Sequence, residues 1–173
     1  ALYDDTVLRR PDNVALVRDN AALLPLFHAV LLAEGTDKVF LYNMEATGFK
    51  PVTGTDWSVL TTKSGELNVS ASAYAAMTWL LEDTRFARRL ALRDGVHAFV
   101  FAARPGATRR TRVTVLLAAE NGRPPVIPPA IAGACYYDIF GNQTPPGVHT
   151  AGRVAYIVAD GLSVSNVIAA LQP

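Results

Sequence analysis

The stretch RRLALRDGVHAFVFAA, residues Arg88 to Ala103, decides the fold of the second half of this chain, because here apolar residues begin to alternate with polar ones. Asp94 and Gly95 interrupt the alternation, and an Asp-Gly pair between two such runs is the strongest short-range signal of a β-hairpin. Three further strands are expected in the runs RVTVLLAAENG, GACYYDIFGN and GRVAYIVAD. Strands of this length and spacing predict an antiparallel β-sandwich. The final run, LSVSNVIAALQ, predicts a closing helix or one more strand.

Before the hairpin, apolar residues recur at the spacing of helices. Residues 12 to 34 predict a long helix that ends at Gly35 and that Pro25 should kink or split in two. Residues 70 to 86 predict a second helix. Between the two helices, the short apolar run from Val39 to Tyr42 is typical of a strand in a parallel sheet covered on both faces. This order of helix, strand, loop and helix is typical of an α/β fold.

The composition limits the classes of partner. The chain has 173 residues, 50% of them hydrophobic and 18% charged, which is enough to bury the core of one domain or of two small ones. With 16 basic and 15 acidic residues the net charge is +1, so we expect no nucleic acid and no membrane surface as a partner. No apolar run approaches the ~20 residues that span a bilayer, and the first residues lack the pattern of a signal peptide. A small neutral or polar ligand fits this balance better.

Other kinds of site find little support in the sequence. The histidines His28, His97 and His149 are scattered along the chain without metal-ligand spacing, so we expect no metal. Neither a nucleophile elbow nor a glycine-rich phosphate loop is present, and no cofactor is expected. The basic run Arg109 to Arg112 is interpreted as a solvated turn. The single cysteine, Cys135, excludes an internal disulfide and is expected to be buried in a strand.

Several of these runs, taken in order, resemble a known family. A helix is followed by FLYNME, then by DWSVLTTKSGELNVSASAYAAMTWL, the hairpin DGVHAFVF, YYDIFGN and VAYIVADGLSVSNVIAAL. This order resembles the C-terminal part of (β/α)₈-barrel retaining glycoside hydrolases with an appended β-sandwich, the clan that includes β-xylosidase and α-L-iduronidase-like enzymes. Trp57 to Leu60 stands where that family has a W-G-L-L passage after its last barrel strand. Asp138 to Asn142 resembles the D-M-F-G-N step of its sandwich.

The resemblance implies a fold in two parts. Residues 1–86 would be the last helix, strand and helix of a (β/α)₈ barrel, and residues 87–173 a small antiparallel β-sandwich that supports it. A whole barrel takes about 250 residues, so the rest would lie on a second polypeptide. Retaining hydrolysis needs two carboxyl groups about 5–5.5 Å apart, and in the family both precede the part that corresponds to Ala1. No catalytic residue is therefore expected here, and the chain alone should be inactive; a secreted or lysosomal-like location would fit such an enzyme.

The resemblance also implies a carbohydrate site. Active sites of these barrels gather at the C-terminal ends of the strands, which here are Tyr42, Asn43 and Glu45, with Trp57 in the loop that follows. An aromatic ring can stack on the apolar face of a sugar, and amide or carboxylate groups can hydrogen-bond its hydroxyls. We therefore expect these four residues to bind carbohydrate. A catalytic role for Glu45 together with Asp56 is a weaker alternative.

Two other functions stay open. The chain can be a free-standing carbohydrate-binding or interaction module, with surface aromatics on one sheet face. Tyr136, Tyr137 and Tyr156 are the candidates, although consecutive residues of a strand point to opposite faces. The chain can also be a structural part of a larger assembly without a ligand of its own. Asn68 and Asn142 each begin a glycosylation-acceptor tripeptide, whose use the sequence leaves open.

Overall fold

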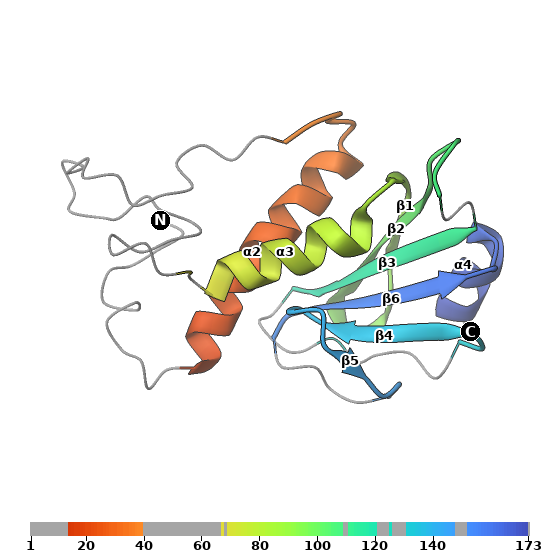
Figure 1. The fold of residues 1–173 in the computed structure, drawn as a ribbon. Helices are drawn as coiled ribbons and strands as arrows, with labels where there is room; N and C mark the ends of the chain where they lie inside the picture. Colours follow the sequence, from red (N-terminus) through yellow and green to blue (C-terminus); the bar gives the residue numbers. More distant parts are fainter. Residues whose placement is uncertain are drawn as a thin grey trace.

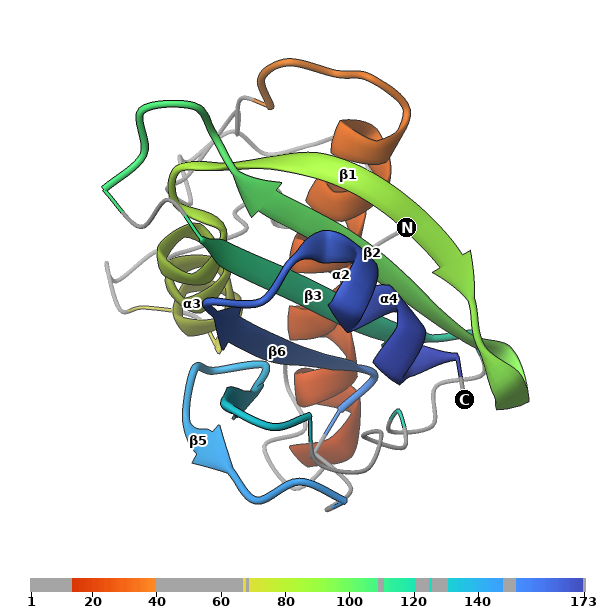
Figure 2. The same ribbon diagram turned by 90° about the vertical axis from the view of Figure 1, so that its right-hand side faces the viewer.

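The computed structural model of the chain describes residues 14–39, 67, 69–108, 111–120, 125, 131–147 and 152–172. Within them, helices cover both faces of a single open sheet (Figure 1). The helices α2 (Val14–Ala33) and α3 (Val69–Leu81) lie on one face, and α4 (Val164–Leu171) lies on the other, as Figure 2 shows from the side of α4. The described part is therefore mixed α/β, with three layers.

The sheet has six strands, and all of its pairings are antiparallel. Along the sheet the order is β1-β2-β3-β6-β4-β5, so β6 inserts between β3 and β4. The expected strands are confirmed, but the described residues form one sheet and not two sheets packed together. The bounds are β1 (Thr84–Ala91), β2 (Val96–Ala103), β3 (Arg112–Ala119), β4 (Ala134–Asp138), β5 (Gln143–Thr144) and β6 (Val154–Asp160).

The hairpin predicted at Asp94 and Gly95 is present between β1 and β2. Both residues take a positive φ, 59° and 69°, which glycine adopts freely and aspartate tolerates. The amide of Leu92 donates to the carbonyl of Val96 at 2.7 Å and closes the loop. The final run, for which a helix or a strand was expected, is the helix α4, and the hydroxyl of Ser163 caps its first turn by accepting from the Asn166 amide.

The second predicted helix is shorter than expected. It ends at Leu81, and the strand β1 already begins at Thr84, where helix was predicted as far as residue 86. Asp83 has a φ of 57° and reverses the chain between the two elements. Phe86, the last residue of the predicted helix, packs instead against Phe101 of the neighbouring strand, with ring centroids 5.8 Å apart. Sheet packing therefore decides the conformation of this segment, and not local spacing.

The first predicted helix is continuous. It runs from Val14 to Ala33 with Pro25 inside it, so the proline does not split it in two. The expected stop at Gly35 is confirmed: this glycine has a φ of +89°, and its amide donates to the carbonyl of Leu32. The amide of Thr36 donates to the carbonyl of Leu31 at 3.0 Å. These two bonds form the motif that commonly ends helices at a left-handed glycine.

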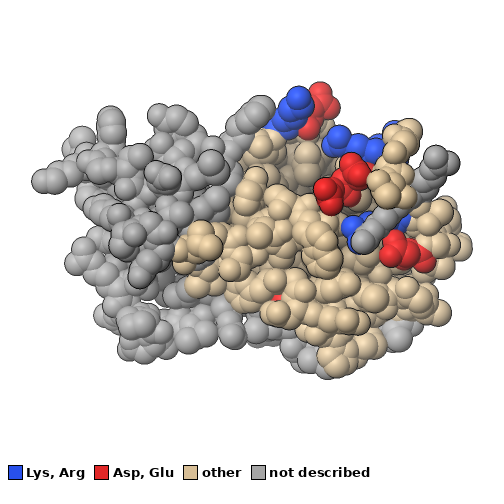
Figure 3. All heavy atoms as spheres, viewed as in Figure 1, with Lys and Arg blue, Asp and Glu red and all other residues tan. Residues whose placement is uncertain are grey.

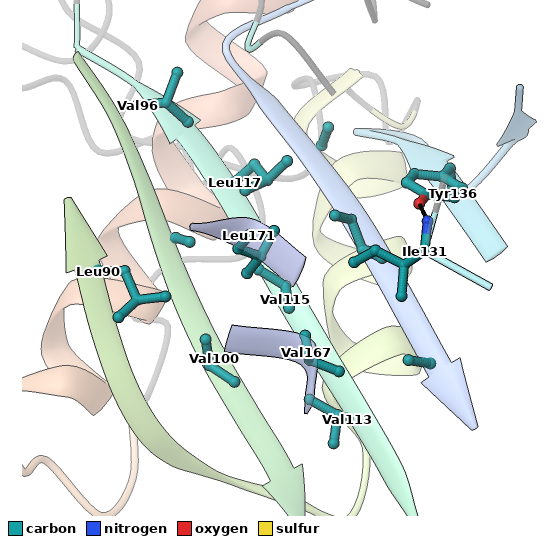
Figure 4. Close-up of a cluster of buried hydrophobic side chains, with 14 of the residues drawn as sticks. Leu90, Val96, Val100, Val113, Val115, Leu117, Ile131, Tyr136, Val167 and Leu171 are labelled. Carbon is teal, nitrogen blue, oxygen red and sulfur yellow. Dashed lines mark hydrogen bonds between the residues drawn. The ribbon is translucent and has the colours of Figure 1, made fainter. Parts of the chain in front are cut away.

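Two hydrophobic clusters hold the three layers together. All eight residues of β3 are buried, and alternate residues face opposite layers. Val113, Val115 and Leu117 belong to the α4 cluster, shown in Figure 4, together with Val167 and Leu171 of the helix. The other face forms the helix-pair cluster, in which α2 and α3 pack on the sheet; its large members are Met77, Leu80, Phe99, Phe101, Leu116, Ile139, Val154, Tyr156 and Val158.

Cys135 is exposed, which contradicts the expectation of a buried thiol. It lies opposite Val158 in the pairing of β4 with β6. At this end of the sheet β5 is short, and it pairs only with Tyr136 and Tyr137. The thiol therefore lies near the edge of the sheet, where little else covers it.

Some expectations concern residues outside the described ranges. The predicted strand from Val39 to Tyr42 is one of them beyond its first residue, and the division of the chain at residue 86 stays a prediction. In the described part, no helix combines the length and the hydrophobicity that are needed to cross a membrane.

Candidate functional site

The residues predicted to bind carbohydrate from the sequence are Tyr42, Asn43, Glu45 and Trp57. All four lie outside the described residues, so their grouping into one site stays a prediction. The described part instead brings together a different set of polar side chains, at the end of the sheet where α3 turns into β1.

This second set lines a pocket of about 250 Å³. The last turn of α3, the first residue of β1, the end of β2 and the first residue of β3 all meet there. On the surface in Figure 3, acidic and basic side chains gather side by side at the upper right, where Figure 1 places the turn from α3 to β1. The polar residues and the aromatic residue of the lining are Trp79, Glu82, Asp83, Thr84, Thr108 and Arg112.

Arg112 is the basic group of the pocket, and its direction follows from strand alternation. Thr114, two residues further along β3, donates its hydroxyl to the carbonyl of Leu80 in α3, so Arg112 also faces the helix pair. Only 7% of the Arg112 side chain is exposed. Its Nε lies 3.8 Å from Oδ1 of Asp160, which is too far for a hydrogen bond, and it has no hydrogen-bond partner among the described residues. The interpretation of residues 109–112 as a solvated turn is therefore wrong at Arg112.

Glu82 and Asp83 supply the acidic groups. They form the two-residue turn that follows α3, and both side chains are exposed. The backbone of this turn is held by β2 and the loop after it: the amide of Arg104 donates to the carbonyl of Asp83 at 2.7 Å, and its Nε donates to the carbonyl of Thr84 at 2.8 Å. The two carboxylates are thus presented from a fixed backbone.

Trp79 is the aromatic residue that lines the pocket, and 46% of its surface is exposed. Its ring meets that of Tyr137 in β4 at nearly a right angle, 85°, with centroids 5.8 Å apart. Such edge-to-face contacts are favourable and restrict the rotation of both rings. The pocket therefore combines an exposed indole, carboxylate acceptors and a guanidinium donor. Sequence reasoning missed it because its members are separated along the chain and none belongs to a short motif.

The Asp138–Asn142 turn is the second feature with a defined geometry. Oδ1 of Asp138 accepts from the amides of Phe140 and Asn142, both at 2.9 Å, and Oδ2 accepts from Nδ2 of Asn142. Gly141 has a φ of +80°, and a Cβ at this position would lie 3.3 Å from Cβ of Ala76 in α3. The D-x-F-G-N step therefore forms a capped turn whose backbone approaches α3 closely. Nδ2 of Asn142, the atom that glycosylation would modify, is engaged by this carboxylate.

The expected row of surface aromatics is not present. Tyr136 and Tyr156 are both buried, because helices cover each face of the sheet. The hydroxyl of Tyr136 accepts from the amide of Ile131 at 2.6 Å, the bond drawn in Figure 4. Tyr137 is half-buried against Trp79. Two of the three tyrosines are therefore core residues, and the module hypothesis loses the surface it was based on.

His28 is a buried histidine in the interface between the two helices. Its ring is 5% exposed and lies against Tyr74 of α3, with centroids 5.4 Å apart. Nδ1 donates to the carbonyl of Leu24 at 2.9 Å. Burial lowers the pKa of His28, and the hydrogen bond to Leu24 opposes this shift only in part. These contacts make His28 a packing residue of the helix pair. Within the described residues, no group of histidine, cysteine or acidic side chains could hold a metal ion.

The lowered pKa of His28 predicts that stability falls in mild acid. The unfolded chain has a histidine pKa of about 6.5 and binds more protons than the folded chain below that pH. We expect full stability above about pH 6.5 and a progressive loss as the pH falls towards the folded pKa. Urea unfolding at a series of pH values measures the effect, and His28→Leu should flatten the curve in this window. An unchanged slope in His28→Leu would assign the acid sensitivity to other groups.

Comparison with known proteins supports the resemblance at the level of fold. The sequence matches no protein-family model and no curated protein. The structure is similar to part of a family 39 glycoside hydrolase from the gut symbiont Bacteroides cellulosilyticus WH2, with a TM-score of 0.58 and 19% sequence identity. The match covers 87% of this chain but only 31% of the hydrolase, so the chain spans about a third of that enzyme.

Proposed function

We propose that this chain is the C-terminal portion of a glycoside hydrolase, in which it completes a (β/α)₈ barrel and supports it with its β-sheet module. The observation that carries the proposal is the structural match, which includes nearly all of this chain and only a fraction of a family 39 hydrolase. The order of the sequence motifs supports the same assignment independently. In this proposal the residues before Thr84 belong to the barrel, and the single sheet that begins there supports it.

The packing of the helix pair suits such a supporting role. α2 and α3 bury one side against the sheet. In the Asp138–Asn142 turn, the backbone at Gly141 also packs closely against Ala76 of α3. Apolar side chains of both helices are nevertheless left exposed: 53% of Phe27 and 40% of Val69. We propose that the rest of the barrel, on a second polypeptide or in the same longer chain, covers them.

The division of chemical roles follows from the residues. The acid/base and the nucleophile of a retaining hydrolase are two carboxylates, and in this proposal both belong to the earlier barrel strands. This chain would contribute to carbohydrate binding through Tyr42, Asn43, Glu45 and Trp57, at the end of the last strand. Without the earlier barrel strands this chain would hydrolyse no glycoside, because its own binding residues include neither catalytic carboxylate.

Hydrolysis assays test this proposal. The assembly purified from the source organism and the 173-residue chain alone are each given a panel of aryl glycosides, and the anomer released first is identified by NMR. We expect the assembly to hydrolyse at least one substrate with retention of configuration and the chain alone to hydrolyse none. Activity of the isolated chain, or inversion by the assembly, would overturn the proposal.

A further inference from the structure

We propose that the pocket formed by Trp79, Glu82, Asp83, Thr108 and Arg112 binds one residue of a neutral carbohydrate. Its residues are different from those proposed to bind carbohydrate at the end of the last barrel strand. It rests only on described residues of this chain and does not require the rest of a barrel.

The size of the pocket sets the size of the ligand. Pockets for drug-sized ligands occupy about 300–1,000 Å³, and this one, at about 250 Å³, lies just below that range. Such a volume suits a single sugar ring and not a folded oligosaccharide. Because the pocket opens at the end of the sheet, beside the exposed carboxylates of Glu82 and Asp83, the neighbouring residues of a longer glycan could extend into solvent.

The charges of the lining disfavour an anion. The exposed carboxylates of Glu82 and Asp83 outnumber the single guanidinium of Arg112, which already has Asp160 as an acidic neighbour. Sugar hydroxyls carry no charge, and each can donate to a carboxylate and accept from a guanidinium. Neighbouring hydroxyls of one ring can therefore use both kinds of group at once.

Arg112 gives a specific reason to expect a polar ligand. Its Nε is buried and has no hydrogen-bond partner within the described residues. Buried donors that are left without an acceptor are costly, and they are uncommon in native proteins. Nε itself is closed to solvent, and its acidic neighbour is Asp160, 3.8 Å away. A ligand hydroxyl would therefore approach this guanidinium through the part of Arg112 that lines the pocket.

Trp79 supplies the apolar surface that sugar recognition also needs. The C–H groups of one face of a pyranose are apolar, and an aromatic ring can pack against them. The indole is about half exposed, and its contact with Tyr137 holds it in place before any ligand binds. Preorganisation of this kind reduces the entropic cost of binding.

Titration of the full 173-residue chain tests the proposal directly. The probes are methyl β-D-xyloside and methyl β-D-glucoside as neutral sugars, with sodium glucuronate and sodium sulfate as anionic comparators. The readout is the indole N–H signal of each tryptophan in a ¹H–¹⁵N NMR spectrum, and Trp57→Phe assigns the two signals. We expect saturable binding of at least one neutral sugar, with a dissociation constant on the order of 1 mM, and a shift of the Trp79 signal.

Variants locate the site. Trp79→Ala should weaken binding by about tenfold or more, which corresponds to the roughly 1.4 kcal/mol of a tenfold change. Glu82→Gln and Asp83→Asn should each weaken it several-fold; both side chains are exposed, and asparagine tolerates the positive φ of residue 83, so folding should be unchanged. Arg93→Gln, an exposed position in the β1–β2 hairpin outside the pocket lining, is the control and should bind as the parent does. Circular dichroism confirms that each variant is folded.

Three results would overturn the proposal. The first is the absence of saturable binding for both neutral sugars. The second is loss of binding in Trp57→Phe with binding retained in Trp79→Ala, which would place the ligand at the barrel edge instead. The third is preferential binding of glucuronate or sulfate, which would make the pocket an anion site. None of these results depends on hydrolysis, so a failure here is distinct from a failure of the proposed glycosidase function.

Discussion

Replacing Gly141 by valine is expected to lower the free energy of unfolding by about 3 kcal/mol or more. Two costs add at this position. The φ of +80° is strained for a β-branched residue, at about 1–3 kcal/mol. A Cβ there would also lie 3.3 Å from Cβ of Ala76, so the further methyl groups of valine overpack the contact with α3, at about 1–3 kcal/mol. The Asp138–Asn142 turn would have to move away from the helix.

Gly133 provides a matched control for this substitution. Its φ is +78°, nearly the same, but a Cβ at this position has no atom within 4 Å. Gly133→Val should therefore lower the free energy of unfolding only by the cost of the strained backbone. Urea unfolding of the two variants measures the difference, which is the contribution of the close approach to α3. Equal losses in both variants would mean that the close approach of the turn does not stabilise the position of α3.

Leu116→Ala is expected to have the second large effect, a loss of about 2–5 kcal/mol. Leu116 is fully buried in β3 and belongs to the helix-pair cluster. Its removal leaves a cavity between the sheet and the helices. Without the rest of a barrel, α2 and α3 have mainly the sheet to pack on, so we expect helices and sheet to unfold in one transition in both the parent and the variant. Tryptophan fluorescence of a Trp57→Phe background, in which Trp79 of α3 is the remaining indole, and far-ultraviolet circular dichroism should then give the same midpoint.

Leu117→Ala is the control for that experiment, because Leu117 is equally buried but faces the α4 cluster. It should destabilise the chain by a similar amount without a specific effect on the helix pair. If Leu116→Ala instead separates the two probes, with the helices unfolding at lower urea than the sheet, the helix pair is only weakly attached. The chain would then consist of two parts that fold independently.

The elements that the sequence predicts correctly are those with local causes. The hairpin at Asp94 and Gly95 depends on two residues with the required backbone preference, and the helix stop at Gly35 depends on one. The alternating strands likewise have a pattern that can be seen within a few residues. The end of α3 could not be predicted in this way, because no glycine or proline marks it. It depends on the positive φ of Asp83 and on the packing of Phe86 against Phe101 of the neighbouring strand.

The candidate pocket could not be predicted because its parts are distant in the sequence. Trp79 and Arg112 come together only after β1, β2 and β3 have paired. The burial of Arg112 and Tyr156 has the same kind of cause, since it depends on which layer of helices covers each face of the sheet. A strand pattern shows that faces alternate, but it does not show what covers them.

The most direct test of the central claim is the mass of the assembly that contains this chain when it is purified from its source. Light scattering gives the total mass, and intact-mass spectrometry gives the mass of each polypeptide. The account predicts that this sequence occurs together with enough further polypeptide to complete a barrel of about 250 residues, either in the same chain or bound to it. A monomer of 18.6 kDa as the natural form would contradict the account, because such a chain would have no barrel to complete.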